Sequence, residues 1–108
     1  MYTLYTERND SYMLEKQIEN YFVQLLQKRK CLCWKFVSPG IAGVPDRIII
    51  LPFGKVVFAE IKAPGGKLRK LQKIRCKQLE MQKVDVWQID SKEKIEKFIK
   101  YYGLDLYE

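Results

Sequence analysis

The fold is decided by the segment Gly43-Val44-Pro45-Asp46-Arg47-Ile48-Ile49-Ile50-Leu51, which leads through a turn at 52–55 into Val56-Val57-Phe58-Ala59-Glu60-Ile61-Lys62. Runs of β-branched residues on either side of a Pro/Gly turn predict a β-hairpin. In a hairpin folded about Phe53 and Gly54, opposed residues have numbers that sum to about 106 or 107. Asp46 is therefore expected to lie opposite Glu60.

Two carboxylates and one ammonium group are expected to converge beside this hairpin. Side chains two apart on a strand share a face, so Glu60 and Lys62 point together while Ile61 points the other way. Hard cations such as Mg²⁺ prefer oxygen ligands, usually one or two carboxylates completed by water and phosphate. A neighbouring lysine can hold the attacking water or offset charge that develops on a phosphate. The pattern thus predicts a metal-dependent nuclease site.

The same residues also allow a purely structural interpretation. Asp46 could begin a turn, and Glu60 with Lys62 could form an ion pair at a sheet edge, where such pairs contribute little stability. However, Asp46 directly follows Gly-x-Pro, and the runs between the charged residues are too apolar for a solvated edge. We therefore favour a functional site.

Length and composition predict one domain over residues 1–108, with residues 1–10 as an arm. The first ten residues lack the apolar core of a signal peptide, and no stretch approaches the length of a membrane span. We expect an intracellular, cytoplasmic protein. Because there is no histidine, nucleophiles and general bases that depend on histidine are excluded.

The cysteine pattern predicts free thiols. Cys31, Cys33 and Cys76 are an odd number, and strand geometry keeps a C-x-C pair from closing easily into a disulfide. A structural zinc site needs about four ligands at suitable spacing, which this chain does not offer. Chemistry is left to carboxylates, lysines and a metal.

The positive charge is concentrated in one segment. The chain carries 20 Lys and Arg against 13 Asp and Glu, a formal net charge of +7. Between Lys62 and Lys83 basic residues far outnumber the single acid, Glu80, whereas the rest of the chain is balanced. A charge so localised predicts a polyanionic partner.

The first helix is predicted over residues 11–30, with Ser11 as its N-cap. Helical geometry places Glu15 inside the apolar face of this helix and Glu19 one turn on, at the edge of that face. A glutamate there would need a cation to receive it, or both side chains could instead extend to water. The apolar face consists of Leu14, Ile18, Phe22, Leu25 and Leu26.

A second helix is predicted at roughly 68–82 and has two unlike sides. Leu68, Leu71, Ile74 and Leu79 share one side, and the basic residues gather on the other. A solvated face would explain the basic side, but the helix begins just beyond Lys62, so we favour contact with a DNA backbone. Gln72 could reach the site from the first turns. The residues expected to bind DNA are Lys67, Arg69, Lys70, Lys73 and Lys77.

The remaining elements complete an α/β fold. Strands are expected at 31–37 and 84–89, and a last helix is expected to begin at Asp90, with Glu93 completing a capping box and Gly103 ending it. Its predicted buried residues are Ile95, Phe98, Ile99 and Tyr102. The order α-β-β-β-α-β-α describes a mixed four-stranded sheet flanked by helices.

With these residues in place, the sequence resembles the VRR-NUC (virus-type replication-repair nuclease) family of the PD-(D/E)XK nuclease superfamily. The resemblance runs from Leu14 to about Ile99 and implies a restriction-endonuclease-like core. Its carriers are Glu15, Gly43-Val44-Pro45-Asp46, Glu60-Ile61-Lys62-Ala63-Pro64-Gly65-Gly66 and Gln72.

The resemblance implies a role for each of these positions. Asp46 and Glu60 would bind Mg²⁺ or Mn²⁺, with the Ile61 carbonyl as a further ligand. Lys62 would position or activate the water, and Gln72 would support the site. Glu15 would contribute through metal-bound water, and Glu19, one turn away, is the alternative for that role.

The resemblance also implies a substrate and an assembly. Some family members occur in phages, and others are fused to DNA repair enzymes. Family members that stand alone in chains this short look like homodimeric endonucleases that act on branched DNA such as Holliday junctions. We expect the same here. A non-catalytic basic DNA-binding protein on a nuclease fold and a sequence-specific restriction-type enzyme are the alternatives.

Overall fold

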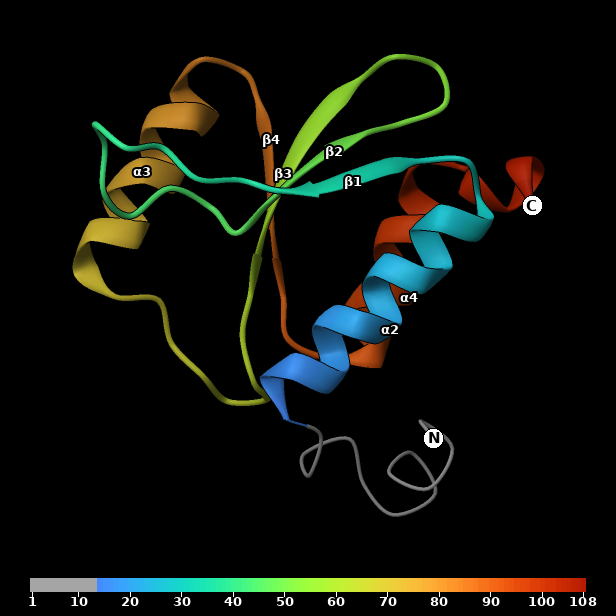
Figure 1. Cartoon of the computed structure of the whole chain (residues 1–108), viewed down its shortest axis with the longest axis horizontal. Helices are drawn as coiled ribbons and strands as arrows, with labels where there is room; N and C mark the ends of the chain where they lie inside the picture. Colours follow the sequence, from blue (N-terminus) through green and yellow to red (C-terminus); the bar gives the residue numbers. More distant parts are fainter. Residues whose placement is uncertain (1–13) are drawn as a thin grey trace.

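A four-stranded sheet forms the centre of the molecule (Figure 1). The computed structural model describes residues 14–108, so the expected arm at 1–10 and the Ser11 cap lie outside the described residues. Strands β1 (Leu32–Lys35), β2 (Arg47–Ile50) and β3 (Val56–Ile61) are antiparallel neighbours, whereas β4 (Asp85–Ile89) runs parallel to β3. The predicted mixed sheet is confirmed.

Within residues 14–108, three α-helices cover the sheet unequally. Helices α2 (Glu15–Lys28) and α4 (Lys92–Tyr101) lie side by side over one face, whereas α3 (Lys70–Met81) stands alone on the other side (Figure 1). A short 3₁₀ helix, η2 (Leu104–Tyr107), follows α4. The predicted order α-β-β-β-α-β-α is confirmed. Among the described residues, no helix is long and apolar enough to span a bilayer.

The register of the hairpin is the predicted one. Arg47 lies opposite Ala59 and Ile48 opposite Phe58, so one further step along the chain brings Asp46 level with Glu60. The turn is closed by the Leu51 N–H, which donates to the Lys55 carbonyl at 2.9 Å.

The core lies between the sheet and helices α2 and α4. Val57, Ala59 and Ile61 alternate along β3 into this core, so Phe58 and Glu60 face the α3 side. From the helices the core receives Ile18, Phe22, Leu26, Ile95, Phe98 and Ile99.

Helix α3 packs against β4 and is also docked through the loop that precedes Asp46. None of its residues is fully buried, and Leu71 and Ile74 on its predicted apolar side remain about 40% exposed. Instead, the Arg75 Nε–H donates to the Ala42 carbonyl at 2.7 Å. A Cβ on Gly43 would lie 2.8 Å from Leu71 Cγ, and φ is +85° at this glycine. Only glycine satisfies both constraints without strain.

The start of α4 differs from the prediction by one residue. Ser91, and not Asp90, is the N-cap, because the Ser91 hydroxyl accepts from the Lys94 N–H at 3.1 Å. Ser91 is the last residue with extended backbone, so its side chain lies within reach of the free N–H groups of the first turn. Gly103, in the left-handed conformation, follows the helix as predicted.

Two further expectations can be compared with the structure. The three cysteines are free thiols, as predicted, and burial raises the pKa of Cys31 and of Cys33 to about 11. Tyr102, expected in the buried stripe of α4, is only partly buried because the helix ends one residue earlier.

The end of α3 offers a test of the backbone geometry. Lys83 adopts φ of +67°, and the following Val84 N–H donates back to the Leu79 carbonyl at 3.0 Å. A side chain is unfavourable in this left-handed conformation, whereas glycine is not. Lys83→Gly should therefore raise the free energy of unfolding by about 0.5–1 kcal/mol in urea denaturation. Lys77→Gly, inside the same helix, should lower it by about 1 kcal/mol. A loss of stability in both variants would contradict the assigned conformation.

Candidate active site

Asp46 is fixed where β2 begins and β3 ends. Its Oδ2 accepts a hydrogen bond from the Ile61 N–H at 2.8 Å, and its carbonyl accepts from the Phe36 N–H at the same distance. The carboxylate is thereby fastened to the peptide between Glu60 and Lys62. The structure thus brings the two predicted metal ligands together.

Glu60 is a buried carboxylate with unequal oxygens. Its relative exposure is 1%. Oε2 accepts from Gln72 Nε2 at 2.7 Å and lies 3.7 Å from Lys62 Nζ. Oε1 is buried and has no hydrogen-bond partner among the described residues. One oxygen of Glu60 is therefore held by the protein, and the other lacks a compensating group.

The surroundings of Glu60 favour its neutral form. Burial, and then the neighbouring Asp46 carboxylate, raise the pKa of Glu60 to about 7, against an opposing effect of Lys62. In the absence of any other cation, two carboxylates share one lysine, so the site is short of positive charge.

A hard divalent cation fits this arrangement. It would supply the missing charge and a partner for the orphaned Oε1 of Glu60. Within residues 14–108, no cluster of three or more Asp, Glu, His or Cys side chains is placed to hold a metal by itself. A cation held by Asp46 and Glu60 would therefore complete its coordination with other oxygens, which is how Mg²⁺ is usually bound.

Gln72 links α3 to the site. It is the third residue of that helix, and its Oε1 accepts from the Arg69 N–H at 2.8 Å. This bond leaves the amide nitrogen to donate to Glu60. The predicted contact of Gln72 with the site is thus present, and the helix start orients the carboxylate.

The two glutamates of α2 are arranged differently from the prediction. Glu15 is exposed, and Glu19 is the more buried, because α2 begins at Glu15 and its first turn extends past the core. Glu19 pairs with Arg47, whose Nε lies 3.0 Å from Glu19 Oε2. Glu15 has no such partner among the described residues and lines a cleft of about 230 Å³ together with Asp46. Its contribution to the site stays a prediction.

The residues expected to bind DNA are all exposed: Lys67, Arg69, Lys70, Lys73 and Lys77. None of them forms an ion pair with another residue in the described part of the chain. Lys73 and Lys77 line a hollow of about 240 Å³ whose wall includes Glu60. The basic side of α3 therefore opens onto the buried carboxylate.

Two residues beside the site, Arg47 and Trp87, were not predicted from the sequence. Arg47 neutralises Glu19 beside the site, and Trp87 lines the same hollow as Glu60. The alternation of Arg47 with the core residue Ile49 could have indicated that the guanidinium faces α2. No pattern in the sequence points to Trp87, because its position depends on the packing of α3 and α4 around β4.

The fold is that of a nuclease domain. A solved structure described as "VRR_NUC domain" superposes with a TM-score of 0.76 at 25% identity, over 82% of this chain and 96% of that one. The resemblance to the VRR-NUC family predicted from the sequence is therefore confirmed. No family model matches the chain.

A phage protein is also similar in sequence. The chain is 51% identical over 53 residues to "Putative nuclease p44" of Acyrthosiphon pisum secondary endosymbiont phage 1. The match covers 49% of this chain and spans 57% of the length of that protein.

The raised pKa of Glu60 gives the metal-free protein a specific pH dependence. Since the folded protein holds the proton up to about pH 7 instead of 4.5, stability should fall as the pH rises through this interval and then level off. Glu60→Gln keeps the shape and removes the charge. It should be more stable than the wild type by about 2 kcal/mol at pH 8 and nearly equal at pH 5. Urea denaturation with chelator present measures both, and an equal difference at both pH values would contradict the assignment.

Proposed function

We propose that the chain is a divalent-metal-dependent endodeoxyribonuclease in which Asp46 and Glu60 hold Mg²⁺ or Mn²⁺. The observation that carries the proposal is the buried Glu60 carboxylate, which lies beside Asp46 with one oxygen unpartnered. When bound, the cation would polarise a phosphodiester and lower the pKa of an attacking water. The name of the similar phage protein also supports a nuclease.

Each carboxylate keeps one oxygen for this purpose. The Ile61 N–H holds Asp46 Oδ2, and Gln72 holds Glu60 Oε2. The second oxygens are left for the cation. The Ile61 carbonyl, on the peptide that follows the Asp46 contact, is our proposed third ligand from the protein.

Lys62 is placed to act on the reacting groups. Its side chain is only 13% exposed, and its ammonium lies 3.7 Å from Glu60. An ammonium held there can orient a water molecule or offset the charge that develops on the phosphate. Glu15, at the mouth of the cleft that Asp46 lines, would contribute through water.

DNA is the proposed substrate because the unpaired cations of α3 lie next to the site. Lys73 and Lys77 share a hollow with Glu60, so a phosphate backbone bound there passes the proposed metal ligands. The alternative is a non-catalytic DNA-binding protein. We favour the nuclease because Glu60 contacts both Lys62 and Gln72, and Asp46 is bonded to the Ile61 N–H between Glu60 and Lys62.

Cleavage should require both carboxylates. Asp46→Asn and Glu60→Gln should each lower cleavage of a labelled four-way junction at least about a hundredfold, because each removes a metal ligand. Binding of the same DNA in chelator should persist. Linear duplex and single strand, with Mg²⁺, Mn²⁺ or chelator, show whether the cut depends on branching and on the metal.

Lys97→Gln, an exposed position on α4, is the matched control and should cut normally. Cleavage retained in both carboxylate variants would exclude this site. Binding without cuts in every metal condition would favour the non-catalytic alternative.

We further propose a homodimer formed through the open part of the sheet. On the face opposite the core, the side chains of Leu32, Trp34 and Val56 are 41–56% exposed. They belong to regular strands of the sheet, so this part of the sheet surface is apolar and uncovered. Glu60 faces the same side. Paired cuts in a junction need two sites, and a second copy seated on this face would supply the other one by two-fold symmetry.

Trp34→Glu tests this interface. A buried carboxylate would oppose dimer formation, whereas the exposed position of Trp34 leaves the fold of one chain intact. We expect the dimer to be replaced by a monomer in sedimentation velocity, with loss of paired cuts. Leu106→Glu, at an 88% exposed position on η2, should leave the dimer unchanged. A wild type that is monomeric, or a Trp34→Glu protein that stays dimeric, would contradict the interface.

A further inference from the structure

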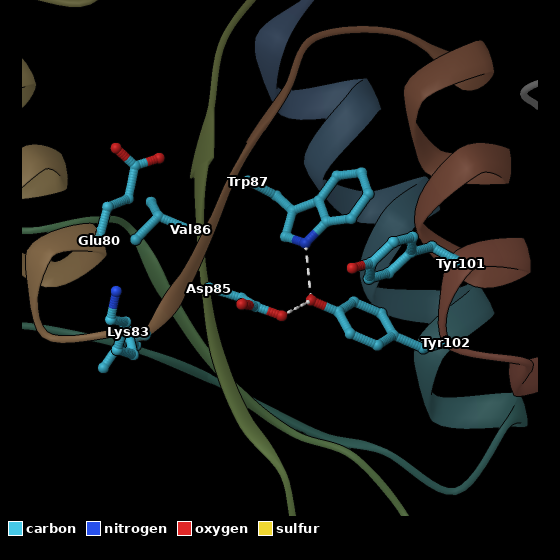
Figure 2. Close-up of a pocket in the computed structure, with 8 residues that line it drawn as sticks. Glu80, Lys83, Asp85, Val86, Trp87, Tyr101 and Tyr102 are labelled. Atoms are coloured by element: carbon cyan, nitrogen blue, oxygen red, sulfur yellow. Dashed lines mark hydrogen bonds between the residues drawn. The ribbon is translucent and has the colours of Figure 1, made fainter.

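Two adjoining hollows follow the free edge of β4 from the site to the ends of α3 and α4. The inner hollow, of about 240 Å³, is lined by Glu60, Lys73 and Lys77. The outer hollow, of about 620 Å³, reaches Tyr101 and Tyr102 (Figure 2). Both hollows are lined by Glu80, Val86 and Trp87, so the two hollows form one continuous depression, which we call the β4 groove.

The outer end of the β4 groove presents an aromatic ring that is both exposed and held in place. Tyr101 is 70% exposed. Its ring packs edge to face against Tyr102, with centroids 4.9 Å apart, and against Trp87 at 5.6 Å. A rigid tyrosine with a free face is suited to stack on a flat ligand, because little side-chain entropy is lost on binding.

Hydrogen bonds hold Trp87 and Tyr102, the two rings that pack against Tyr101, in place. The Trp87 Nε1–H donates to the Tyr102 hydroxyl at 2.9 Å, and that hydroxyl donates to the Asp85 carboxylate (Figure 2). Burial and the bond to Asp85 raise the pKa of Tyr102 above its ordinary value, so the hydroxyl keeps its proton. The polar groups of Trp87 and Tyr102 are thereby occupied, and their neighbour Tyr101 is left to meet a ligand.

The charges change along the β4 groove. At the inner end, Lys73 and Lys77 suit phosphates. At the outer end, Asp85 is paired with Lys55, whose Nζ lies 3.6 Å from Asp85 Oδ2, and Glu80, where the two hollows meet, offsets the charge of Lys83. No excess of positive charge remains there. This end is unsuited to a phosphate backbone, but it suits a base, whose amino groups can donate to carboxylates.

We propose that the β4 groove binds an unpaired DNA strand continuous with the strand at Glu60, and that one base of this strand stacks on Tyr101. This inference rests on the nuclease function proposed above. A base inside a duplex has neighbours on both faces, so only an unpaired base can stack on a protein ring. The substrate would therefore present unpaired nucleotides beside the cut, either as a single-stranded arm or where base pairs open at the branch point of a junction.

The length of the groove sets the position of that base. Glu60 is level with Gln88, and Asp85 lies three residues earlier on β4, or about 10 Å along the strand. A strand stacked in a duplex rises about 3.4 Å per nucleotide, and an unpaired strand is more extended, so this length holds at most about three nucleotides. The stacked base is expected within that distance of the scissile phosphate.

Tyr101→Ala tests the stacking contact. We expect it to weaken binding of a duplex with a single-stranded arm about fivefold or more and to leave a blunt duplex unaffected, measured by fluorescence anisotropy in chelator. Tyr101→Phe, which keeps the ring, should bind like the wild type, as should Leu106→Ala, which removes a different exposed apolar side chain. Equal binding of every DNA by the wild type and Tyr101→Ala would overturn the proposal.

Abasic sites locate the contact. Moved one nucleotide at a time along the arm, an abasic site should weaken binding by the wild type at one position within about three nucleotides of the cut. At that position it should not weaken binding by Tyr101→Ala further. Equal losses for the arm and the blunt duplex would instead show that Tyr101 contacts paired DNA or supports the fold, and would overturn the proposal.

These results can be separated from the nuclease function itself. Metal-dependent cleavage, with unchanged binding by Tyr101→Ala, would overturn the role of the β4 groove and leave the nuclease. An arm-specific loss of binding without cleavage in any metal would support the groove and overturn the activity.

Discussion

The hydrogen bond from the Ile61 N–H to Asp46 Oδ2 is the contact on which the site depends. Ile61 is 2% exposed, so its N–H needs a partner, and β2 begins too late in the chain to provide one. The Asp46 side chain replaces the missing bond of the sheet. A buried N–H without a partner would cost about 1–3 kcal/mol. The carboxylate therefore stabilises the hairpin while it is held next to Glu60, and the same bond serves the fold and the site.

Helix α3 shares this dependence, because it contributes no fully buried residue to the core. Besides its packing against β4, it is joined to the rest of the molecule by Gln72 on Glu60, by Arg75 on the Ala42 carbonyl and by the close approach of Leu71 to Gly43. These three contacts involve the site or the loop that leads to Asp46. The helix that carries the exposed lysines is thus positioned in part by the residues around the carboxylates.

Much of this could be predicted from the sequence, because it follows from local periodicity. The register of the hairpin depends only on the turn at Phe53 and Gly54, and it placed Asp46 opposite Glu60 correctly. The exposure of Glu15 could not be predicted, because a helical projection assumes that the whole helix lies against the core. The pairing of Glu19 with Arg47, the docking of α3 on Gly43 and the path of the β4 groove all depend on contacts between distant segments, which periodicity does not report.

Some basic side chains form ion pairs that stabilise the fold, and others have no anionic partner among the described residues and could bind a ligand. Arg29 pairs with Asp105, and Arg47 pairs with Glu19. In these pairs the guanidinium is largely buried and offsets a carboxylate from another element. Lys73 and Lys77, by contrast, remain exposed beside Glu60 and have no anionic partner among the described residues. Under the proposed function, Asp46 and Glu60 would repel a polyanion, and the unpaired lysines next to them would allow a phosphate backbone to approach. The positive charge at 62–83 is what a site with two acids at its base needs in order to bind the proposed acidic substrate.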